Sequence, residues 1–473
     1  MKSAKSLLAF VAIFGAATSA FATEPSTTAT IVRIVGSTAF RQQTHDAIIA
    51  IYDAAPVAAY SGSNLSGCNQ SFFYGQVSSA PVIIETSWSG SAGGVQVVAG
   101  GLTANFLADN LADSTINLAT ASSLSGSGSA AIATGGASLS AGTNSHVADV
   151  TMTDVFQSAT PFRSPTLHDT TVGIVPFKWV ASRGSNVVTL AADTTSGSPV
   201  LANISSTASL AVGMTVSSAN LPATLVHIIS VDSESQVTLS GNATGTATAA
   251  ITIFVTPCPI NNVSPQNAQA LYGSGTAALS VFTGNSADQG ALVYAFGRNP
   301  DSGTRITAFA ESGVGVFSTV SQYKPVVSGS AMTGVALYAS ETVNGILFTA
   351  GNSGEASGST LRGYMGLTTA ALNGGNGAYA LAYLSTGDAV TSLSLGGKEL
   401  SYNGVFYSVS NVQQGLYTFW GYEHLDYQSG LASGKKTIAN SIGTQIINTY
   451  SPVLLSSMKV SRSGDGGVVL QNF

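Results

Sequence analysis

The sequence has 473 residues, of which 44% are hydrophobic and only 8% are charged, and its formal net charge is −6. With 16 Lys and Arg against 22 Asp and Glu, it lacks the basic footprint of a nucleic-acid-binding protein. Its abundant hydrophobic residues exclude a disordered chain, and its length predicts two or three domains.

The first residues have the three parts of a cleavable secretory signal. Lys2 and Lys5 precede an apolar run over 7–17, and an Ala-x-Ala site ends at Ala22. The apolar run is shorter than the ~20 residues that a membrane span needs. We therefore expect a signal peptide over 1–22, a periplasmic or secreted protein, and no embedding in a membrane.

Two strand–turn–helix units follow the signal. A β-branched run over 30–35 meets Gly-Ser-Thr-Ala at 36–39, and residues 41–52 then show helical spacing. A second strand over 81–86 leads into the Gly/Ser turn 90–94 and a weak helical pattern. The N–H groups at a helix start can seat an anion, but hydroxyl-bearing turns before helices are also common as plain caps.

The middle of the chain contains two more predicted strands and then changes character. Residues 147–151 form a strand that ends at Thr153-Asp154, and 171–181 form a strongly apolar strand. From 184 to 256 short alternating runs are separated by Ser, Gly, Asn and Asp, without a helical period. This composition predicts an all-β module.

The α/β pattern then resumes. A helix is expected at 265–272, with Pro in its first turn, and a strand at 292–296. A hairpin is expected around Asn403-Gly404 and a closing helix over 437–450.

The segment after the strand 292–296 carries the clearest chemistry. Arg298 lies four residues before Ser302, and Ser302-Gly303-Thr304 open the next helix with two hydroxyls and free backbone N–H groups. Arg298 can donate charge-assisted hydrogen bonds to the same point, and Asp301 can hold its guanidinium in position. Such a set suits a tetrahedral oxyanion, although a capped turn with a surface arginine fits the segment equally well.

Four segments, in order, resemble those that surround one phosphate in the periplasmic phosphate-binding proteins of ABC transporters. The resemblance implies an α/β protein with the two-lobed type II periplasmic-binding-protein-like fold and an inserted all-β module. It also implies a phosphate site made by one turn of each segment, with these residues: Thr38 and Ala39; Ser91; Asp154; and Arg298, Ser302, Gly303 and Thr304.

The same resemblance implies a division of the chain. Lobe one would comprise 23–172 and about 395–473, and lobe two would comprise 173–394. The β module 184–256 would be an insertion in lobe two. The lobes would close over the ligand by a hinge motion.

The function implied is binding of inorganic phosphate between the lobes, for uptake or scavenging, by a monomer without catalysis or cofactor. Whether an ABC permease is a partner stays open, as does the role of the β module. One alternative is a secreted or cell-surface adhesive protein that kept the fold. A third is a phosphate-ester hydrolase, for which no Ser/His/Asp set or metal motif is legible.

The two cysteines, Cys68 and Cys258, leave two interpretations open. An even count in an exported chain permits one disulfide, but two buried free thiols fit as well. The five histidines show no short metal-ligand spacing, so we expect no metal site.

Overall fold

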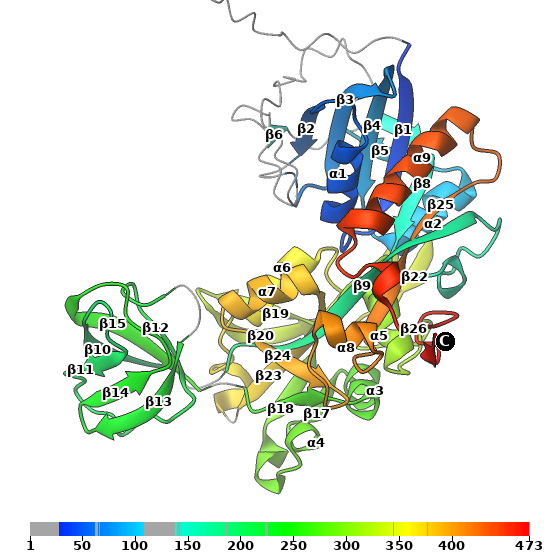
Figure 1. Ribbon diagram of the computed structural model, residues 1–473. Helices are drawn as coiled ribbons and strands as arrows, with labels where there is room; N and C mark the ends of the chain where they lie inside the picture. The colour runs from blue at the N-terminus through cyan, green and yellow to red at the C-terminus, as the bar shows by residue number, and fades with distance from the viewer. Residues whose placement is uncertain are drawn as a thin grey trace, which may run out of the picture.

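The computed structural model describes residues 28–61, 65, 67–107, 138–139, 142, 144–184, 187–222, 226–256, 258–343, 345–375 and 377–472. The predicted signal peptide 1–22 lies outside the described residues. Figure 1 shows two lobes, one above the other, and a small barrel that stands to one side of the lower lobe. Among the helices of the described ranges, none combines the length and the apolar character needed to cross a bilayer.

Lobe one, the upper body in Figure 1, contains one end of a 13-stranded mixed sheet. β1 lies in its centre, parallel to β4 on one side and to β8 on the other. The strands of this part are β1 (Thr30–Gly36), β2 (Val57–Ser61), β3 (Gln70–Val77), β4 (Ala80–Trp88), β6 (Ser138–Leu139) and β8 (Val150–Thr153). A separate hairpin pairs β5 (Thr103–Phe106) with β7 (Asn144–Val147).

Helices cover both faces of this sheet because its strands are apolar on both sides. Val32 and Ile34 of β1 pack into the main core with α1 (Arg41–Ala50) and α9 (Ser433–Gln445). Val35 faces the opposite way and packs against α2 (Ser91–Gly100). The closing helix, expected over 437–450, begins earlier, at Ser433, and its regular α-helical part ends at Gln445.

Two long strands join the lobes. The first half of β9 (His168–Ala181) pairs with β25 (Trp420–Tyr427), and its last residues pair with β23 and β24 of lobe two. Trp179 stacks on Phe419 at this crossing, with ring centroids 5.3 Å apart. The two lobes thus share one apolar core where the strands pass between them.

Lobe two holds the other end of the sheet. Helices α3 and α5 lie on one face, and α6 and α7 pack on the other around a separate cluster that includes Leu361 and Met365. Its strands in the sheet are β16 (Asn262–Val263), β17 (Thr276–Ala278), β18 (Leu292–Ala295), β23 (Ala378–Ser385) and β24 (Lys398–Tyr402). Its helices are α3 (Pro265–Ser274), α4 (Ser280–Thr283), α5 (Gly303–Glu311), α6 (Gly358–Met365), α7 (Thr386–Ser394) and α8 (Val409–Gln413).

Short two-stranded sheets complete the lobes. They are β19 (Tyr323–Ser328) with β20 (Ala331–Leu337), β21 (Glu341–Val343) with β22 (Ile346–Phe348), and β26 (Val460–Ser461) with β27 (Leu470–Gln471). The expected hairpin around Asn403-Gly404 is reduced to one turn. β24 ends at Tyr402, a single bridge pairs Tyr402 with Val405, and α8 begins at Val409. β24 pairs with β16 and β9 on the lobe-two side of the crossing, so residues 398–402 lie with lobe two and not with lobe one, where the expected boundary at about 395 placed them.

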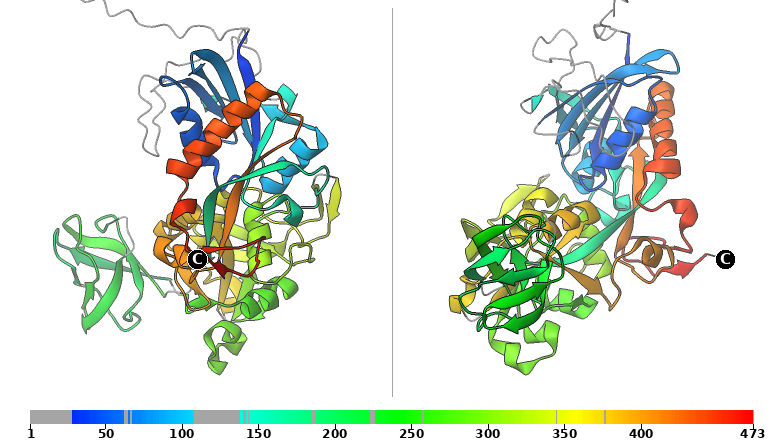
Figure 2. Two further views of the ribbon diagram at one scale, coloured as in Figure 1. Left: turned by 45° about the vertical axis from the view of Figure 1, so that its right-hand side comes forward. Right: turned by 60° about the vertical axis from the view of Figure 1, so that its left-hand side comes forward.

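The inserted module is a closed barrel with its own core. Its order is β10-β11-β14-β13-β12-β15, and inward side chains such as Ile228, Val237 and Phe254 form a cluster separate from that of the lobes. The left-hand view of Figure 2 shows it beside the lower lobe. Its strands are β10 (Val187–Thr194), β11 (Val200–Ala202), β12 (Thr215–Ser217), β13 (Val226–Ser233), β14 (Gln236–Leu239) and β15 (Ala247–Val255).

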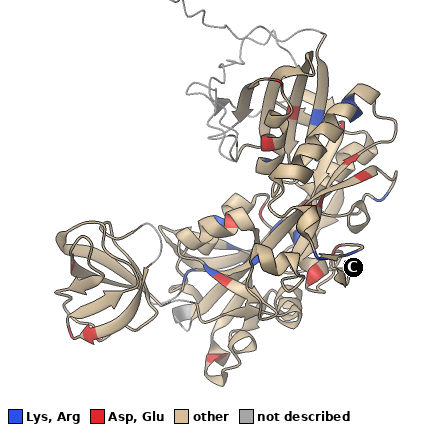
Figure 3. Ribbon diagram, viewed as in Figure 1, with Lys and Arg blue, Asp and Glu red and all other residues tan. Residues whose placement is uncertain are grey.

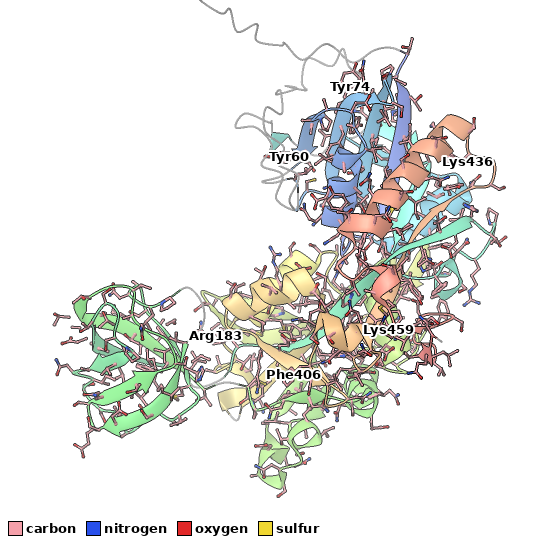
Figure 4. The ribbon with its side chains drawn as sticks, in the orientation of Figure 1. Tyr60, Tyr74, Arg183, Phe406, Lys436 and Lys459 are labelled. Atoms are coloured by element: carbon pink, nitrogen blue, oxygen red, sulfur yellow. The ribbon has the colours of Figure 1, made fainter. Side chains whose placement is uncertain are left out.

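The barrel is attached through a short stalk. Val187 of β10 is in register with Val255 of β15, so the chain enters and leaves the barrel at one point. Arg183, labelled in Figure 4, lies beside this point and donates its backbone N–H to Met365 of lobe two at 2.7 Å. Figure 3 shows acidic but no basic residues on the barrel, in agreement with the absence of Lys and Arg from the sequence 187–255. The predicted α/β fold with an inserted all-β module is confirmed.

Candidate functional site: four turns at the junction of the lobes

Three of the four predicted segments leave the lobe-one sheet at the same level. Gly36 at the end of β1 is in register with Trp88 of β4 on one side and with Met152 of β8 on the other. The turns that follow these strands therefore lie at one edge of the sheet. The carboxyl edge of parallel strands is where open α/β sheets bind their ligands.

Backbone hydrogen bonds hold the first two turns in place. Ser37 donates its N–H to the Met152 carbonyl at 2.8 Å, and Gly90 donates to the Gly36 carbonyl at 2.9 Å. Gly36 has a φ of +129°, and a Cβ there would lie 1.9 Å from the Met152 oxygen. Glycine is required at this position because any side chain would strain the backbone and strike the neighbouring strand.

Ser91 and Asp154 form the buried centre of the site. The Ser91 hydroxyl donates to Asp154 Oδ1, and its oxygen accepts the Asp154 N–H at 3.3 Å. Burial raises the pKa of Asp154, while the Ser91 hydrogen bond and the charge of Arg298 act in the opposite direction. Asp154 is 1% exposed, so its carboxylate is best stabilised by a partner that brings a proton or a positive charge.

The fourth segment brings the start of α5 from lobe two against this centre. Ser302 caps the helix by accepting the N–H of Arg305 at 3.4 Å. Gly303 lies so close to Asp154 that a Cβ would be 1.5 Å from Oδ1 and 2.6 Å from Ser91 Oγ. The positive end of α5 is therefore directed at the carboxylate and the hydroxyl of lobe one.

Arg298 connects the lobes. Its Nη2 donates to Thr38 Oγ1 of lobe one at 3.2 Å and to the Ala356 carbonyl of lobe two at 2.9 Å, and its Nε donates to the Glu355 carbonyl at 3.0 Å. The guanidinium is buried, which lowers its pKa, and the charge of Asp388 is the largest opposing influence. Because backbone carbonyls fix one side of the fork, its direction is set by the fold.

The structure brings the four predicted segments to one place, with differences in detail. The Ala39 N–H, expected to face a ligand, lies 3.2 Å from Ser37 Oγ, which accepts it. Asp301 accepts the Ala92 N–H through its backbone carbonyl at 3.1 Å and so ties the second segment to the fourth. The guanidinium-holding role given to Asp301 stays a prediction.

Some contributors to the site were not predicted. Ser37 adds a buried hydroxyl that acts on Asp154, and Glu355 and Ala356 supply the acceptors for Arg298. Ser37 stands inside the predicted turn, so its hydroxyl could have been noticed. The 355–356 carbonyls could not, because backbone acceptors have no signature in side-chain identity.

Further buried acids lie behind Asp154. The pKa of Glu423 is raised by burial and then by the charges of Asp154 and Asp426. Asp465 accepts the Phe156 N–H at 2.9 Å, and burial raises its pKa to about 7. Asp154 therefore belongs to a group of carboxyls that cannot all be ionised at once without cost.

A cavity of about 350 Å³ opens beside the four turns. Thr38 and Ala39 belong both to its wall and to the predicted site, whereas Ser91, Asp154 and Arg298 lie behind the wall. The centre of the site is thus covered by the closely packed turns, and the cavity lies next to it between α1 of lobe one and α6 and α7 of lobe two.

Two other groups bear on the sequence predictions. Asp169, His424 and Asp426 offer metal-ligating atoms within 4.8 Å of one another, and His424 Nδ1 lies 2.7 Å from Asp169 Oδ1. The expectation of no metal site stays a prediction. Cys68 and Cys258 are separate buried thiols, and burial raises the pKa of each to about 12.

No known protein-family model matches the sequence, and neither does any curated protein. Among solved structures, the chain is similar to an ABC-type phosphate transport receptor from Vibrio cholerae, with 12% identity, a TM-score of 0.40, and coverage of 89% of this chain and 99% of that one. It is also similar to a substrate-binding protein assigned to phosphate ABC transport from Clostridium perfringens, solved with bound phosphate, with 11% identity, a TM-score of 0.39, and coverage of 90% and 100%.

Proposed function

We propose that the chain is an exported phosphate-binding protein that holds inorganic phosphate between its lobes at the four turns. The observation that carries this proposal is the meeting of Asp154, Ser91, Arg298 and the start of α5 at one buried point. The arginine, the hydroxyls and the helix start favour an oxyanion, and the carboxylate restricts which one.

Asp154 would allow the site to discriminate phosphate from sulfate. An ionised carboxylate can accept the hydrogen of hydrogen phosphate, whereas sulfate carries no hydrogen at neutral pH and would face Asp154 as a second acceptor. The raised pKa of Asp154 means that a shared proton relieves the burial of its charge. Phosphate should therefore bind and sulfate should be rejected.

Entry of the anion requires the lobes to separate. Gly303 of lobe two is in van der Waals contact with Ser91 and Asp154 of lobe one, so an ion can lie among them only after α5 moves away. The crossing strands β9 and β25 are the natural hinge, because they are the strands that pass from one lobe to the other. Binding and release then need no covalent step, and the protein would act in uptake or scavenging without turnover.

The test is calorimetric titration of the chain lacking residues 1–22 with phosphate and with sulfate, for the wild type and Asp154→Asn. We expect phosphate to bind at least 100-fold more tightly than sulfate. In Asp154→Asn, phosphate should bind more weakly and the preference should shrink, because the amide can donate to either anion. Asp232→Asn, an exposed change on the barrel, is the matched control.

The outcomes separate the alternatives. Equal binding of the two anions by the wild type would contradict the role of Asp154. Absence of binding by either anion would remove the phosphate proposal and favour the adhesive alternative. Release of inorganic phosphate from a phosphate ester in a parallel incubation with the wild type would favour the hydrolase.

A further inference from the structure

A histidine and two aspartates lie together on one face of the crossing strands β9 and β25. Asp169 of β9 is directly opposite Asp426 of β25, and His424 lies two residues before Asp426, so its side chain points to the same face. The metal-ligating atoms of the three residues all lie within 4.8 Å of one another. His424 is fully buried and Asp426 is 1% exposed, so this group is not a chance cluster of surface acids.

The two carboxylates of this group need more positive charge than the protein supplies there. Side chains directly opposite each other on antiparallel strands are close neighbours, and like charges in such a pair are destabilising. His424 Nδ1 lies 2.7 Å from Asp169 Oδ1, so a protonated His424 would balance one of the two charges. The other negative charge would stay in a buried place. A divalent cation, bound with neutral His424, would balance both.

Two buried polar atoms of the same group have no hydrogen-bond partner among the residues that the structure describes. They are Asp426 Oδ1 and His424 Nε2. Nearly all buried polar atoms in native proteins are hydrogen-bonded, so an unmatched pair in one cluster indicates a missing ion or water. Because no described residue bonds Nε2, the ring can carry its hydrogen there and direct the lone pair of Nδ1 at an ion beside Asp169.

The surroundings of the group provide an entrance on one side and a fixed ligand on the other. The side chain of Asp169 is 44% exposed, so an ion can reach the group from solvent past this residue. On the inner side the ring of Phe156 packs on His424, with the two centroids 4.4 Å apart. The imidazole is thus held in place, and the exposed carboxylate can adjust to the ion.

We infer that Asp169, His424 and Asp426 bind a divalent transition-metal ion such as Zn²⁺. One imidazole nitrogen and two carboxylate oxygens are ligands that zinc accepts at about 2.0–2.2 Å, with a fourth position for water. Two ligands of one zinc ion are at most about 4.4 Å apart, so only a small shift of Asp169 is needed. Mg²⁺ is less suited, because it prefers oxygen ligands. The inference goes beyond the proposed phosphate function and against the expectation of no metal site.

The experiment is calorimetric titration with zinc chloride of the chain lacking residues 1–22, made without a histidine tag, in phosphate-free buffer. We expect one zinc ion to bind per chain, and an equal concentration of Mg²⁺ not to compete. Asp169→Asn should bind zinc at least about tenfold more weakly, since loss even of a group that only supports a metal ligand costs about 10- to 100-fold. His227→Gln, which removes an exposed histidine from the barrel, should keep wild-type affinity.

A second variant and a second measurement separate loss of the site from misfolding. Asp426→Asn replaces a buried carboxylate by an amide of the same shape, so the metal-free protein should still fold. Zinc at about 100 times its dissociation constant should raise the unfolding temperature of the wild type by about 3 °C. This shift should disappear in Asp426→Asn, while the unfolding temperature without zinc shows that the variant is folded.

The results decide between binding at this group and binding elsewhere. Absence of saturable zinc binding by the wild type would overturn the inference, as would equal zinc affinity of the wild type, Asp169→Asn and Asp426→Asn. Loss of binding in His227→Gln would place the ion on the barrel and would also overturn it. The phosphate titrations contain no zinc, so the proposed phosphate function is judged separately.

Discussion

Gly303 offers a sharp test of the site, because its neighbours leave no room for a methyl group. A Cβ at this position would lie 1.5 Å from Asp154 Oδ1 and 2.6 Å from Ser91 Oγ, and real contacts of this kind are essentially never below 3.0 Å. Gly303→Ala must therefore push the Asp154 carboxylate away from the start of α5. The backbone itself tolerates alanine, since Gly303 is the first residue of a regular helix.

The size of the effect follows from the bond that is lost. A hydrogen bond to a charged group contributes about 1.5–3 kcal/mol, so displacement of Asp154 should weaken phosphate binding by about 10- to 150-fold. The α5 helix itself should not be weakened, because alanine in place of glycine favours a helix by up to about 1 kcal/mol. Gly303→Ala should thus lower the affinity for phosphate without weakening the α5 helix.

The assay is phosphate titration by calorimetry together with thermal unfolding of Gly303→Ala. Gly434→Ala is the matched control, since Gly434 lies in the first turn of α9 with nothing within 4 Å of a built Cβ. We expect the control to keep wild-type affinity. If Gly303→Ala bound phosphate within threefold of the wild type, Asp154 and Gly303 would not form part of the ligand site.

Three further predictions concern pH and the barrel. Because burial raises the pKa of Asp465 to about 7, the contribution of this residue to stability is lost as pH rises from about 4 to 7. At pH 8 the free energy of unfolding of Asp465→Asn, measured by denaturant titration, should exceed that of the wild type by up to about 4 kcal/mol. At pH 4 the two proteins should not differ in this way. Burial, followed by the charge of Arg41, lowers the pKa of His45 to about 3. The free energy of unfolding of the wild type should therefore fall by up to about 3 kcal/mol between pH 7 and 4.5. In the same denaturation series, the free energy of unfolding of His45→Gln should fall less. Replacement of 187–255 by a short Gly-Ser linker should leave phosphate affinity within threefold of the wild type in calorimetry, because the two ends meet in one β pair and the barrel core is separate; unfolding of the shortened chain would contradict this independence.

Local sequence signals predicted elements well where one segment determines its own structure. Ser264 and Asn267 form a reciprocal capping box around Pro265, and the helix predicted at 265–272 is observed as α3. The apolar strand expected at 171–181 is the last part of β9. The alternating runs of 184–256 form the barrel, because alternation defines an inside and an outside for each strand.

Elements that depend on distant partners were not predictable in the same way. β2 and β3 pair with each other and extend the lobe-one sheet, yet the sequence analysis predicted no strand at 57–61 or 70–77. The exposed hairpin of β19 and β20 bears few buried side chains, so it shows no clean alternation. Whether such segments form strands depends mainly on the sheet edge or turn with which they pair, and only weakly on their own composition.

The site shows the same division between local and distant information. The family resemblance named Thr38, Ser91, Asp154 and Ser302 as site residues, and in the structure the turns that carry them lie together. The cavity could not be located, since its arginines lie on helices more than 300 residues apart in sequence and no motif links Arg41 to Arg362. Distances between lobes are a property of the folded chain alone.

Arg298 shows how this division affects function. The sequence suggested that Asp301, three residues away, would hold the guanidinium. In the structure the carbonyls of Glu355 and Ala356 accept its hydrogen bonds, and Asp388 is the acid whose charge opposes its lowered pKa most. Because the carbonyls that accept these hydrogen bonds are neutral, they fix Arg298 without cancelling its charge, which can act on an anion at the four turns. An acidic partner in direct contact would have fixed the same geometry while weakening that attraction, so the use of backbone acceptors favours binding of a ligand over a purely structural role for Arg298.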